Sequence, residues 1–580
     1  MSRTDAMNGA ELLVDTLVQA GVRRIFSLSG NQIMPVYDAC IDARISIVHV
    51  RHESAAVHMA DAWAQITGEI GVALVTAGPG FGNALSALFS ARHSESPVLL
   101  LSGDSPVSAD GNGAFQELAQ VDIARPLVKI SRRPVRVERL GHDIAAAIAC
   151  ARSGRPGPAH VALPFDVLGS KADDASRIGT AALDRRPRAL APPRAEAIVH
   201  RVMRAKRPVV LTGPSMNRSR NGARVTALET ALGAPVVPME SPRGLRDPAL
   251  GTFSDALAAA DLVVLLGKAV DFAMGFARPP AMNAGAELVV VDPDEAMIDR
   301  ARRLAGDRVV ISACADPDLA ADAMVAAAFG ETAGASGASE EAGGALRASA
   351  TLSGETAGMP GASAASHRAW RDEVAGAIGN RAVVTEADVR FHPRAVCTAV
   401  QRVLDPASDP VLVCDGGEFG QWSQALCTAP VRIINGLSGA IGGGLCHALA
   451  AKLARPEATV VAMMGDGTAG FHFTELDTAV REEAAFVTVI GNDFRWNAEH
   501  QIQLREYGPD RLIGCNLAPS ARYDLAAAGL GGHGEHVTEP ADLDAALARA
   551  LASGRPACVN AEIDGVAAPA FRGKTAQDSR

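Results

Sequence analysis

The sequence predicts an α/β fold made of three doubly wound domains, each built on a parallel sheet. Short apolar runs that end in Gly or Asp alternate with Ala-rich stretches, and strands covered by helices on both faces have this continuous apolar character. The chain has 580 residues, too many for one hydrophobic core. The expected strands lie in 72–78, 97–104, 208–213, 261–267, 286–294, 410–417, 458–467 and 485–493.

Two breaks in composition divide the chain. Residues 185–194 are rich in Pro and Arg, and residues 329–366 are rich in Ala, Gly and Ser with little to bury, so we expect part of this second tract to be mobile. The predicted organisation is an N-terminal domain (1–184), a central domain (195–328), a linker (329–384), a C-terminal domain (385–566) and a tail (567–580).

The first and third domains resemble each other. Each contains a Gly-rich turn, an Ala/Leu-rich helix and an apolar strand that ends in a Gly/Asp turn, at 76–104 and 437–467. We therefore expect two duplicated halves of one architecture.

Composition narrows the classes of partner. The formal net charge of -10 comes without a long basic run, which argues against nucleic acid and membrane surfaces and leaves small molecules. No apolar stretch is long enough to span a bilayer, and the first 21 residues suit an amphipathic helix better than a signal peptide. Nine cysteines without a CxxC pair indicate a reducing cytoplasm, with neither a zinc site nor disulfides.

The most informative motif is Asp466 between Gly465 and Gly467, at the end of one apolar run. The next run ends at Asn492 and Asp493. Because the carboxyl ends of parallel strands meet at one edge of the sheet, these side chains should lie side by side and form a place for a divalent cation. The glycines let the backbone approach a phosphate, and a helix expected from about Thr474 would offer free amides.

These motifs, together with HVRHESAAVHMADAWAQITGEIGVALVTAGPGFGNAL at 49–85, resemble the thiamine-diphosphate enzymes, in particular the acetolactate synthase-like family and its 2-hydroxyacyl-CoA lyase-like branch. The resemblance implies that Glu53 is the catalytic residue that activates the cofactor through its pyrimidine ring. It also implies metal binding by the Asp466 side chain, the Asp493 side chain and the Arg495 carbonyl group. Asp493 stands where the family has Asn but still offers a hard oxygen ligand, and Asn492 is a secondary candidate.

Further segments extend the resemblance over nearly the whole chain, and each residue that they contribute also has an ordinary structural interpretation as a turn, corner or cap. Ile441 is expected to support the bent shape of the cofactor. The expected cofactor-binding residues are Gly30, Gly78, Pro79, Asn83, Gly417, Glu418, Phe419, Gly439, Ile441, Gly465, Gly467, Thr468, Asn492 and Arg495. The expected substrate-side residues are Asn31, His93, Gln116, His472 and Trp496.

The implied function is that of a carbon–carbon lyase or carboligase that depends on thiamine diphosphate and Mg²⁺. Its substrates would be 2-oxo acids, aldehydes or 2-hydroxyacyl thioesters, converted through a C2 carbanion and enamine. Acetolactate synthase-type condensation and 2-oxo acid decarboxylation are alternatives within the family. Outside it, a nucleotide-linked oxidoreductase and an inactive binding protein remain.

The central domain leaves one cofactor undecided. Some relatives bind FAD or the ADP part of CoA there, but this domain lacks the GxGxxG fingerprint. Asp292 could contact a ribose, although a capping role before Pro293 is the simpler interpretation. The resemblance also implies a homo-oligomer, a dimer or a tetramer, in which the first domain of one subunit faces the third domain of another.

Overall fold

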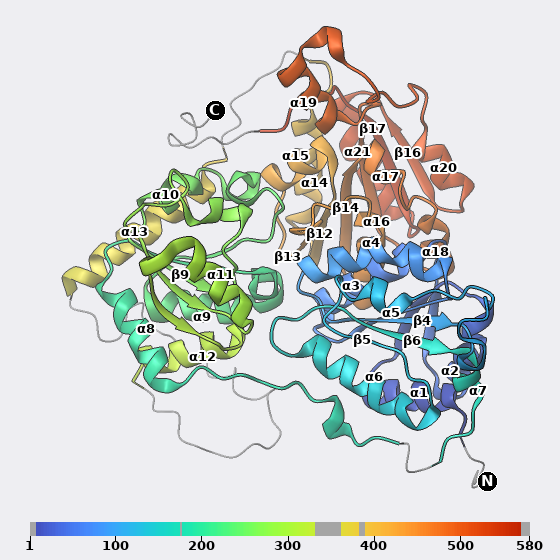
Figure 1. The fold of residues 1–580 in the computed structure, drawn as a ribbon. Helices are drawn as coiled ribbons and strands as arrows, with labels where there is room; N and C mark the ends of the chain where they lie inside the picture. Colours follow the sequence, from blue (N-terminus) through green and yellow to red (C-terminus); the bar gives the residue numbers. More distant parts are fainter. Residues whose placement is uncertain (1–6, 174–176, 331–360, 382–388, 570–580) are drawn as a thin grey trace.

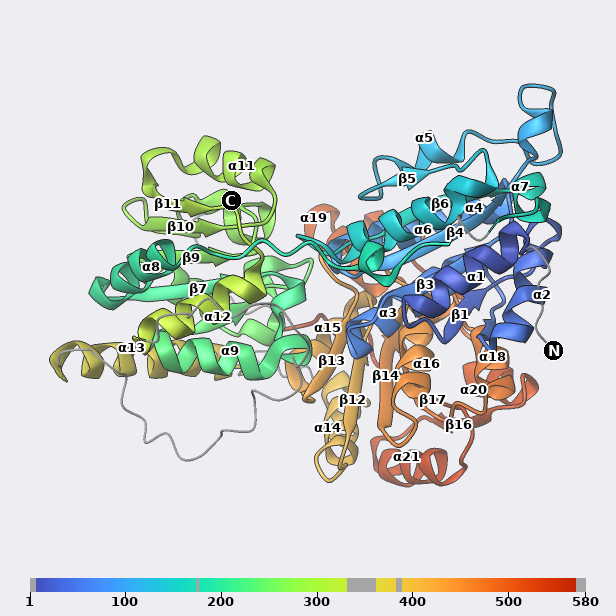
Figure 2. The same cartoon turned by 90° about the horizontal axis from the view of Figure 1, so that it is seen from below.

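The computed structural model describes residues 7–173, 177–330, 361–381 and 389–569, which contain three separate sheets. Every strand pair within them is parallel, and helices cover the sheets (Figure 1). The predicted α/β fold class is confirmed. In Figures 1 and 2 the N-terminal domain, coloured blue to cyan, packs against the orange and red C-terminal domain, and the green central domain lies beside both.

The first sheet has the strand order β2-β1-β3-β4-β6-β5. Its strands are β1 (Arg24–Ser27), β2 (Ser46–His49), β3 (Gly71–Val75), β4 (Val98–Asp104), β5 (Ser131–Arg132) and β6 (Ala159–Pro164). Its helices are α1 (Gly9–Gln19), α2 (Met34–Ala43), α3 (Glu53–Thr67), α4 (Pro79–His93), α5 (Gln120–Ala124), α6 (Val137–Arg152) and α7 (Phe165–Gly169).

The central sheet has the order β11-β10-β9-β7-β8. Its strands are β7 (Pro208–Thr212), β8 (Val236–Pro238), β9 (Leu262–Leu266), β10 (Glu287–Val291) and β11 (Val309–Ala313). Its helices are α8 (Pro192–Arg204), α9 (Arg218–Leu232), α10 (Phe253–Ala259), α11 (Glu295–Ala305) and α12 (Pro317–Ala328).

The tract expected to be a linker contributes a further helix to the central domain. Helix α13 (Gly361–Gly379) buries Trp370 and Val374 in the central core, and the Trp370 indole N–H donates to the Pro208 carbonyl at 2.9 Å. Two apolar side chains among many small and polar residues were too weak a periodic signal to predict this packing. The mobility expected for this tract falls mainly on 331–360, which lie outside the described residues.

The third sheet has the order β13-β12-β14-β15-β17-β16. Its strands are β12 (Pro410–Cys414), β13 (Val431–Ile434), β14 (Thr459–Gly465), β15 (Val487–Asn492), β16 (His533–Val537) and β17 (Ala557–Glu562). Its helices are α14 (Pro393–Leu404), α15 (Gly417–Leu426), α16 (Gly444–Ala454), α17 (Asp466–Ala469), α18 (Glu475–Arg481), α19 (Asn497–Tyr507), α20 (Tyr523–Gly529) and α21 (Leu543–Ala552). Counted from its own first strand, this order repeats that of the first sheet, as the sequence echo predicted.

Helices α3 and α16 join the first and third domains. One hydrophobic core runs through both, from Val48 and Ala56 on the N-terminal side to Leu449 and Val460 on the C-terminal side. Ala-rich faces let the two helices approach closely, so most of α3 is buried, including its charged first residue. Among the helices of the described residues, none is both long and apolar enough to cross a membrane.

Candidate active site

The N-terminal part of the candidate site is centred on Glu53, the first residue of α3. His52 caps this helix by accepting the Ser54 N–H, which places the Glu53 carboxylate just beyond the end of β2. The side chain is buried, and its Oε2 accepts a hydrogen bond from Asn83 Nδ2 at 3.0 Å. A Cβ at residue 80 would lie 3.3 Å from Glu53 Oε1, so Gly80 leaves room beside the carboxylate.

The other site residues predicted in this domain, apart from His93, lie around a row of hydrogen bonds between side chains. The Thr76 hydroxyl donates to Gln32 Oε1 at 2.7 Å, and Gln32 Nε2 donates to Gln116 Oε1 at 2.8 Å. Gly30 packs against Thr76, and Gly78, with φ +56°, packs against Gln116. Pro79 begins α4, and the exposed Asn31 follows Gly30.

His93 is not brought into this group. It is the last residue of α4, and its Nδ1 bonds to the Phe89 carbonyl at 2.9 Å. A helix that begins at Pro79 carries His93 about 20 Å from its first turn, so the two ends of α4 face different surroundings.

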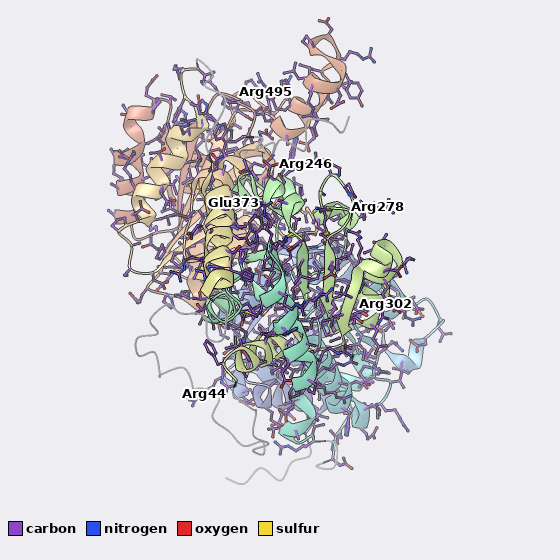
Figure 3. All side chains as sticks on the ribbon, turned by 90° about the vertical axis from the view of Figure 1, so that its left-hand side faces the viewer. Arg44, Arg246, Arg278, Arg302, Glu373 and Arg495 are labelled. Carbon is purple, nitrogen blue, oxygen red and sulfur yellow. The ribbon has the colours of Figure 1, made fainter. Side chains whose placement is uncertain are left out.

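The C-terminal part of the candidate site is a cavity at the carboxyl ends of β12, β14 and β15. Figure 3 labels Arg495, which lies toward the end of the molecule from which α19 projects. Glu53 is not among the lining residues. The cavity is lined by Gly417, Glu418, Phe419, Gly465, Asp466, Gly467, Thr468, Gly491, Asp493, Arg495, Trp496, Asn497 and Glu499.

Asp466 and Asp493 are among the residues that line this cavity. Burial raises the pKa of Asp466 to about 6; burial, together with the neighbouring Asp466, raises the pKa of Asp493 to about 7. Asp466 Oδ1 accepts the Gly467 N–H at 2.9 Å, and Oδ2 accepts the Arg495 N–H at 3.2 Å. A divalent cation fits such a pair, because its positive charge would favour the ionised form of both buried carboxylates and offset the repulsion between them.

No group of three or more His, Cys, Asp or Glu side chains with metal-binding geometry occurs in the described parts of the chain. A cation at Asp466 and Asp493 would therefore need amide, carbonyl or water oxygens as well. The Asn492 amide has other partners: its Nδ2 donates to Ala521 O and Asn560 Oδ1, each at 3.1 Å, and its Oδ1 accepts the Phe494 N–H.

The same cavity has the features of a phosphate cradle. Thr468 Oγ1 is buried and has no hydrogen-bond partner among the described residues. A Cβ at residue 417 would lie 3.5 Å from that oxygen, and Gly417 adopts φ +81°, which a side chain would disfavour. Helix α15 begins at Gly417 and the short α17 at Asp466, so backbone amides point toward the cavity from two sides.

One prediction about this cradle needs correction. The helix expected from about Thr474 is α18, and it faces the N-terminal domain instead: Glu475 Oε1 accepts the Arg51 N–H at 2.9 Å. The Glu418 side chain, although it lines the cavity, is bonded elsewhere. Its Oε1 accepts the Ala568 N–H at 2.6 Å and its Oε2 accepts Gln421 Nε2 at 2.8 Å.

Asp415 is a site-shaping residue that the sequence interpretation missed. Its buried carboxylate accepts N–H groups from Gly416, Gly442 and Gly444, and so ties the turn after β12 to the turn before α16. Ile441 lies between these turns against Gly416, and Gly439 lies near Pro242 of the central domain. The sequence signal for this role was an acidic residue placed directly between an apolar strand and two glycines.

A histidine cluster, formed by His52, His58, His447 and His472, lies between α3 and the C-terminal domain. His472 Nδ1 donates to the Gly442 carbonyl at 2.6 Å, which leaves Nε2 to accept the Ser54 hydroxyl at 2.7 Å. His472 is buried, and the hydrogen bonds from Gly442 through His472 to Ser54 link the cradle to the residue next to Glu53.

Trp496, another substrate-side candidate, packs over Gly467.

The histidine cluster predicts acid sensitivity. Burial, followed by the neighbouring imidazoles, lowers the pKa of His58 well below 6.5, and burial also lowers the pKa values of His447 and His472. The native state keeps these rings neutral, whereas the unfolded chain takes up protons below pH 6.5, so stability is lost as the pH falls. The expected loss at pH 5 is at most about 2 kcal/mol per histidine, reached where the folded-state pKa lies below 5, and there is essentially none at pH 8.

Thermal unfolding at pH 8 and pH 5 checks this expectation. His447→Gln should lose less stability between the two pH values than the wild type, because it removes one buried site of proton uptake. His200→Gln, on the exposed face of α8, is the matched control and should behave like the wild type. Equal pH dependence in the His447 variant and the wild type would contradict the assignment.

The chain matches three family models of thiamine pyrophosphate enzymes. The N-terminal TPP binding domain covers residues 7–123, the central domain covers 195–324, and the C-terminal TPP binding domain covers 415–561. The chain therefore belongs to the thiamine pyrophosphate (thiamine diphosphate) enzyme family, and the resemblance seen in the sequence is confirmed.

Its relatives include members with two different names. A protein named probable acetolactate synthase from Mycobacterium bovis is 31% identical over 576 residues, which cover 96% of each chain. Proteins named 2-hydroxyacyl-CoA lyase 2 from Bos taurus and Homo sapiens are each 30% identical, covering 91% and 92% of this chain and 84% and 86% of their own. The chain is a thiamine-diphosphate-dependent enzyme of the carbon–carbon lyase and carboligase class.

Proposed function

We propose that this enzyme cleaves or forms the carbon–carbon bond next to the carbonyl group of 2-hydroxyacyl thioesters, aldehydes or 2-oxo acids, with Mg²⁺ as its metal. The observation that carries the proposal is the arrangement of two groups at sheet edges. Glu53 with Asn83 is at one edge, and the Asp466–Asp493 pair beside the unpartnered Thr468 hydroxyl is at the other.

Each group has a distinct task in this proposal. Thiamine diphosphate supplies a thiazolium carbon that adds to a carbonyl group and accepts the electrons of the broken bond. Glu53 would hold and move a proton at the pyrimidine ring, while Asn83 orients its carboxylate. Asp466 and Asp493 would hold Mg²⁺, with Asp493 preferred over Asn492 because the Asn492 amide is already bonded to protein groups. Gly417 and Thr468 would bind the diphosphate.

A substrate panel tests the reaction class. The purified chain, supplied with thiamine diphosphate and Mg²⁺, is assayed against 2-hydroxyacyl-CoA esters, aldehydes and 2-oxo acids. Release of an aldehyde from the thioester supports the lyase, and condensation of two 2-oxo acids supports the second candidate, an acetolactate synthase-type reaction. The second candidate is retained because a relative with that name aligns over 96% of the chain. No turnover on any of the three classes would contradict the proposal.

We further propose that two copies of the chain complete each site. The lining residues of the C-terminal cavity do not include Glu53. Exposed apolar side chains occur in both of the domains that carry the site, and a second copy would cover them. They are Phe115, Leu118 and Ile123 in the N-terminal domain, and Phe471, Ile502, Tyr507 and Ile513 in the C-terminal domain.

Complementation tests the shared site. Chains carrying Glu53→Gln and chains carrying Asp466→Asn should each be inactive alone. Co-expressed with two different affinity tags and purified through both, they should regain about half of wild-type activity, because every dimer retained is mixed and has one intact site of two. Size-exclusion chromatography with light scattering should show a dimer or a tetramer. Inactive mixed dimers would contradict a site made from two chains.

We propose a reducing compartment, the cytoplasm, for this enzyme. All nine cysteines are free thiols, and seven of them are buried as small apolar side chains. Thiols in such positions persist where glutathione and thioredoxin keep proteins reduced.

A further inference from the structure

The central domain has the kind of sheet edge at which α/β domains bind nucleotides. Ligands of open parallel sheets bind at the carboxyl ends of the strands. Three polar residues follow three adjacent strands at this edge: Ser215 after β7, Lys268 after β9 and Asp292 after β10. An FAD or ADP molecule would need these groups, or the space in front of them.

The N-terminal domain already occupies this edge. Glu95 lies in the turn between α4 and β4, is only 4% exposed, and adopts φ +52°, a left-handed conformation that is uncommon for glutamate. Its Oε2 accepts both the Ser215 N–H at 3.0 Å and the Ser215 hydroxyl at 2.6 Å. A Cβ at Gly213 would lie 3.0 Å from Glu95 Oε1. The carboxylate therefore sits on the β7 loop as the anionic group of a ligand would.

Arg155 fills the rest of this edge of the central sheet. Its guanidinium donates to both Glu95 and Asp292, whose carboxylates are nearly inaccessible to solvent. Burial alone would lower the pKa of Arg155, but the two carboxylates outweigh it and raise this pKa above its usual value. A ribose that bonded to Asp292 would have to displace Arg155, and would leave buried charges without partners.

The remaining groups at the edge also have protein partners. Lys268 Nζ donates to Asp271 Oδ2 at 2.6 Å and to the Ala269 carbonyl at 3.0 Å. Arg220 donates to the Glu95 carbonyl at 3.1 Å and to the Ser96 hydroxyl at 3.2 Å, so the Glu95 turn is held from the central domain as well. The polar groups that a flavin or adenine nucleotide would need are therefore already bonded to protein groups, mostly across the contact between the two domains.

We infer that the central domain binds neither FAD nor an adenine nucleotide. Glu95 of the N-terminal domain is instead the occupant of the position that such a ligand would take, and it holds the N-terminal domain against this edge of the central sheet. The residues present do not fit the FAD or adenine nucleotide that the sequence left undecided for this domain. Binding of free FAD or ADP, and not turnover, is the observable, so failure of this inference can be told apart from failure of the proposed function.

Calorimetric titration of the full chain, loaded with thiamine diphosphate and Mg²⁺, tests the inference with FAD and ADP as probes. The wild type should contain no flavin after denaturation and should bind neither probe at concentrations up to about 1 mM. Glu95→Ala removes the occupant and frees Arg155 and the Ser215 amide for a phosphate, so its ADP affinity should be at least about tenfold higher than that of the wild type.

Two further variants keep the test decisive. Glu95→Gln keeps the volume of the side chain but not its charge, and should show a smaller gain in ADP affinity. If the alanine variant does not fold, the result for Glu95→Gln tests the inference by itself. Glu138→Ala, on the exposed face of α6, removes an acidic residue elsewhere and should leave ADP affinity unchanged. Flavin in the wild type, stoichiometric binding of either probe to it, or no gain in the folded Glu95 variants would each overturn the inference.

Discussion

The Glu53→Gln variant is expected to lose turnover by roughly 10² to 10⁴-fold, the usual range for removal of a general acid–base group. Gln has the shape of Glu and can still accept the hydrogen bond from Asn83, so the fold of α3 should be kept. It cannot take or give a proton at neutral pH. The proposed proton transfer to the pyrimidine ring is therefore lost, while the diphosphate cradle, formed by other residues, is intact.

Two measurements separate activation from binding in this variant. Exchange of the thiazolium C2 proton for deuterium, followed by NMR on the bound cofactor, should slow in parallel with turnover. Cofactor affinity should stay within about tenfold of the wild type, since Glu53 makes no contact with the C-terminal cavity. The control is Glu138→Gln on the exposed face of α6. Rapid exchange in Glu53→Gln would contradict the activating role.

The Asp466→Asn variant is expected to lose cofactor affinity by at least about 100-fold in the presence of Mg²⁺, because a neutral amide replaces the charged carboxylate that we propose as a metal ligand. Both Asp466 oxygens accept backbone N–H groups, from Gly467 and Arg495, so the variant also disturbs the turn that shapes the cavity. The loss should be seen as a change in the affinity for Mg²⁺ and not only in activity.

Asp493→Asn is the informative comparison. It restores the amide that the family has at this position, so it should bind Mg²⁺ more weakly than the wild type but better than Asp466→Asn. Asp510→Asn, on an exposed turn, is the matched control for the loss of one acidic side chain. Equal Mg²⁺ affinity in Asp466→Asn and the wild type would remove Asp466 from the metal site.

The sequence predicted the sheet-edge features of this enzyme best. Apolar runs are long and unbroken in β4, β9 and β14, because both faces of these strands are covered, and the residues after them meet at the sheet edge through topology alone. That logic predicts that Asp466 and Asp493 lie at one edge, and both line the same cavity. Shorter or more polar strands, such as β16 with the sequence HGEHV, gave no such signal.

Side-chain partners chosen by three-dimensional packing could not be predicted in the same way. The bonds of Asn492 to Ala521 and Asn560 join residues far apart in the chain, and no local pattern indicates them. The same is true of Glu95, which is an unremarkable turn residue in the sequence but reaches the β7 loop of another domain. His93 lies away from Glu53 because it is the last residue of α4, and the sequence did not indicate where this helix ends.

Calorimetric titration of the purified full chain with thiamine diphosphate, with Mg²⁺ and then with a chelator, tests the central claim most directly. The arrangement of Asp466, Asp493 and Thr468 predicts one cofactor bound per chain with Mg²⁺, and loss of that binding when the metal is removed. Absence of binding in the presence of Mg²⁺, or equal affinity with and without the metal, would contradict the account.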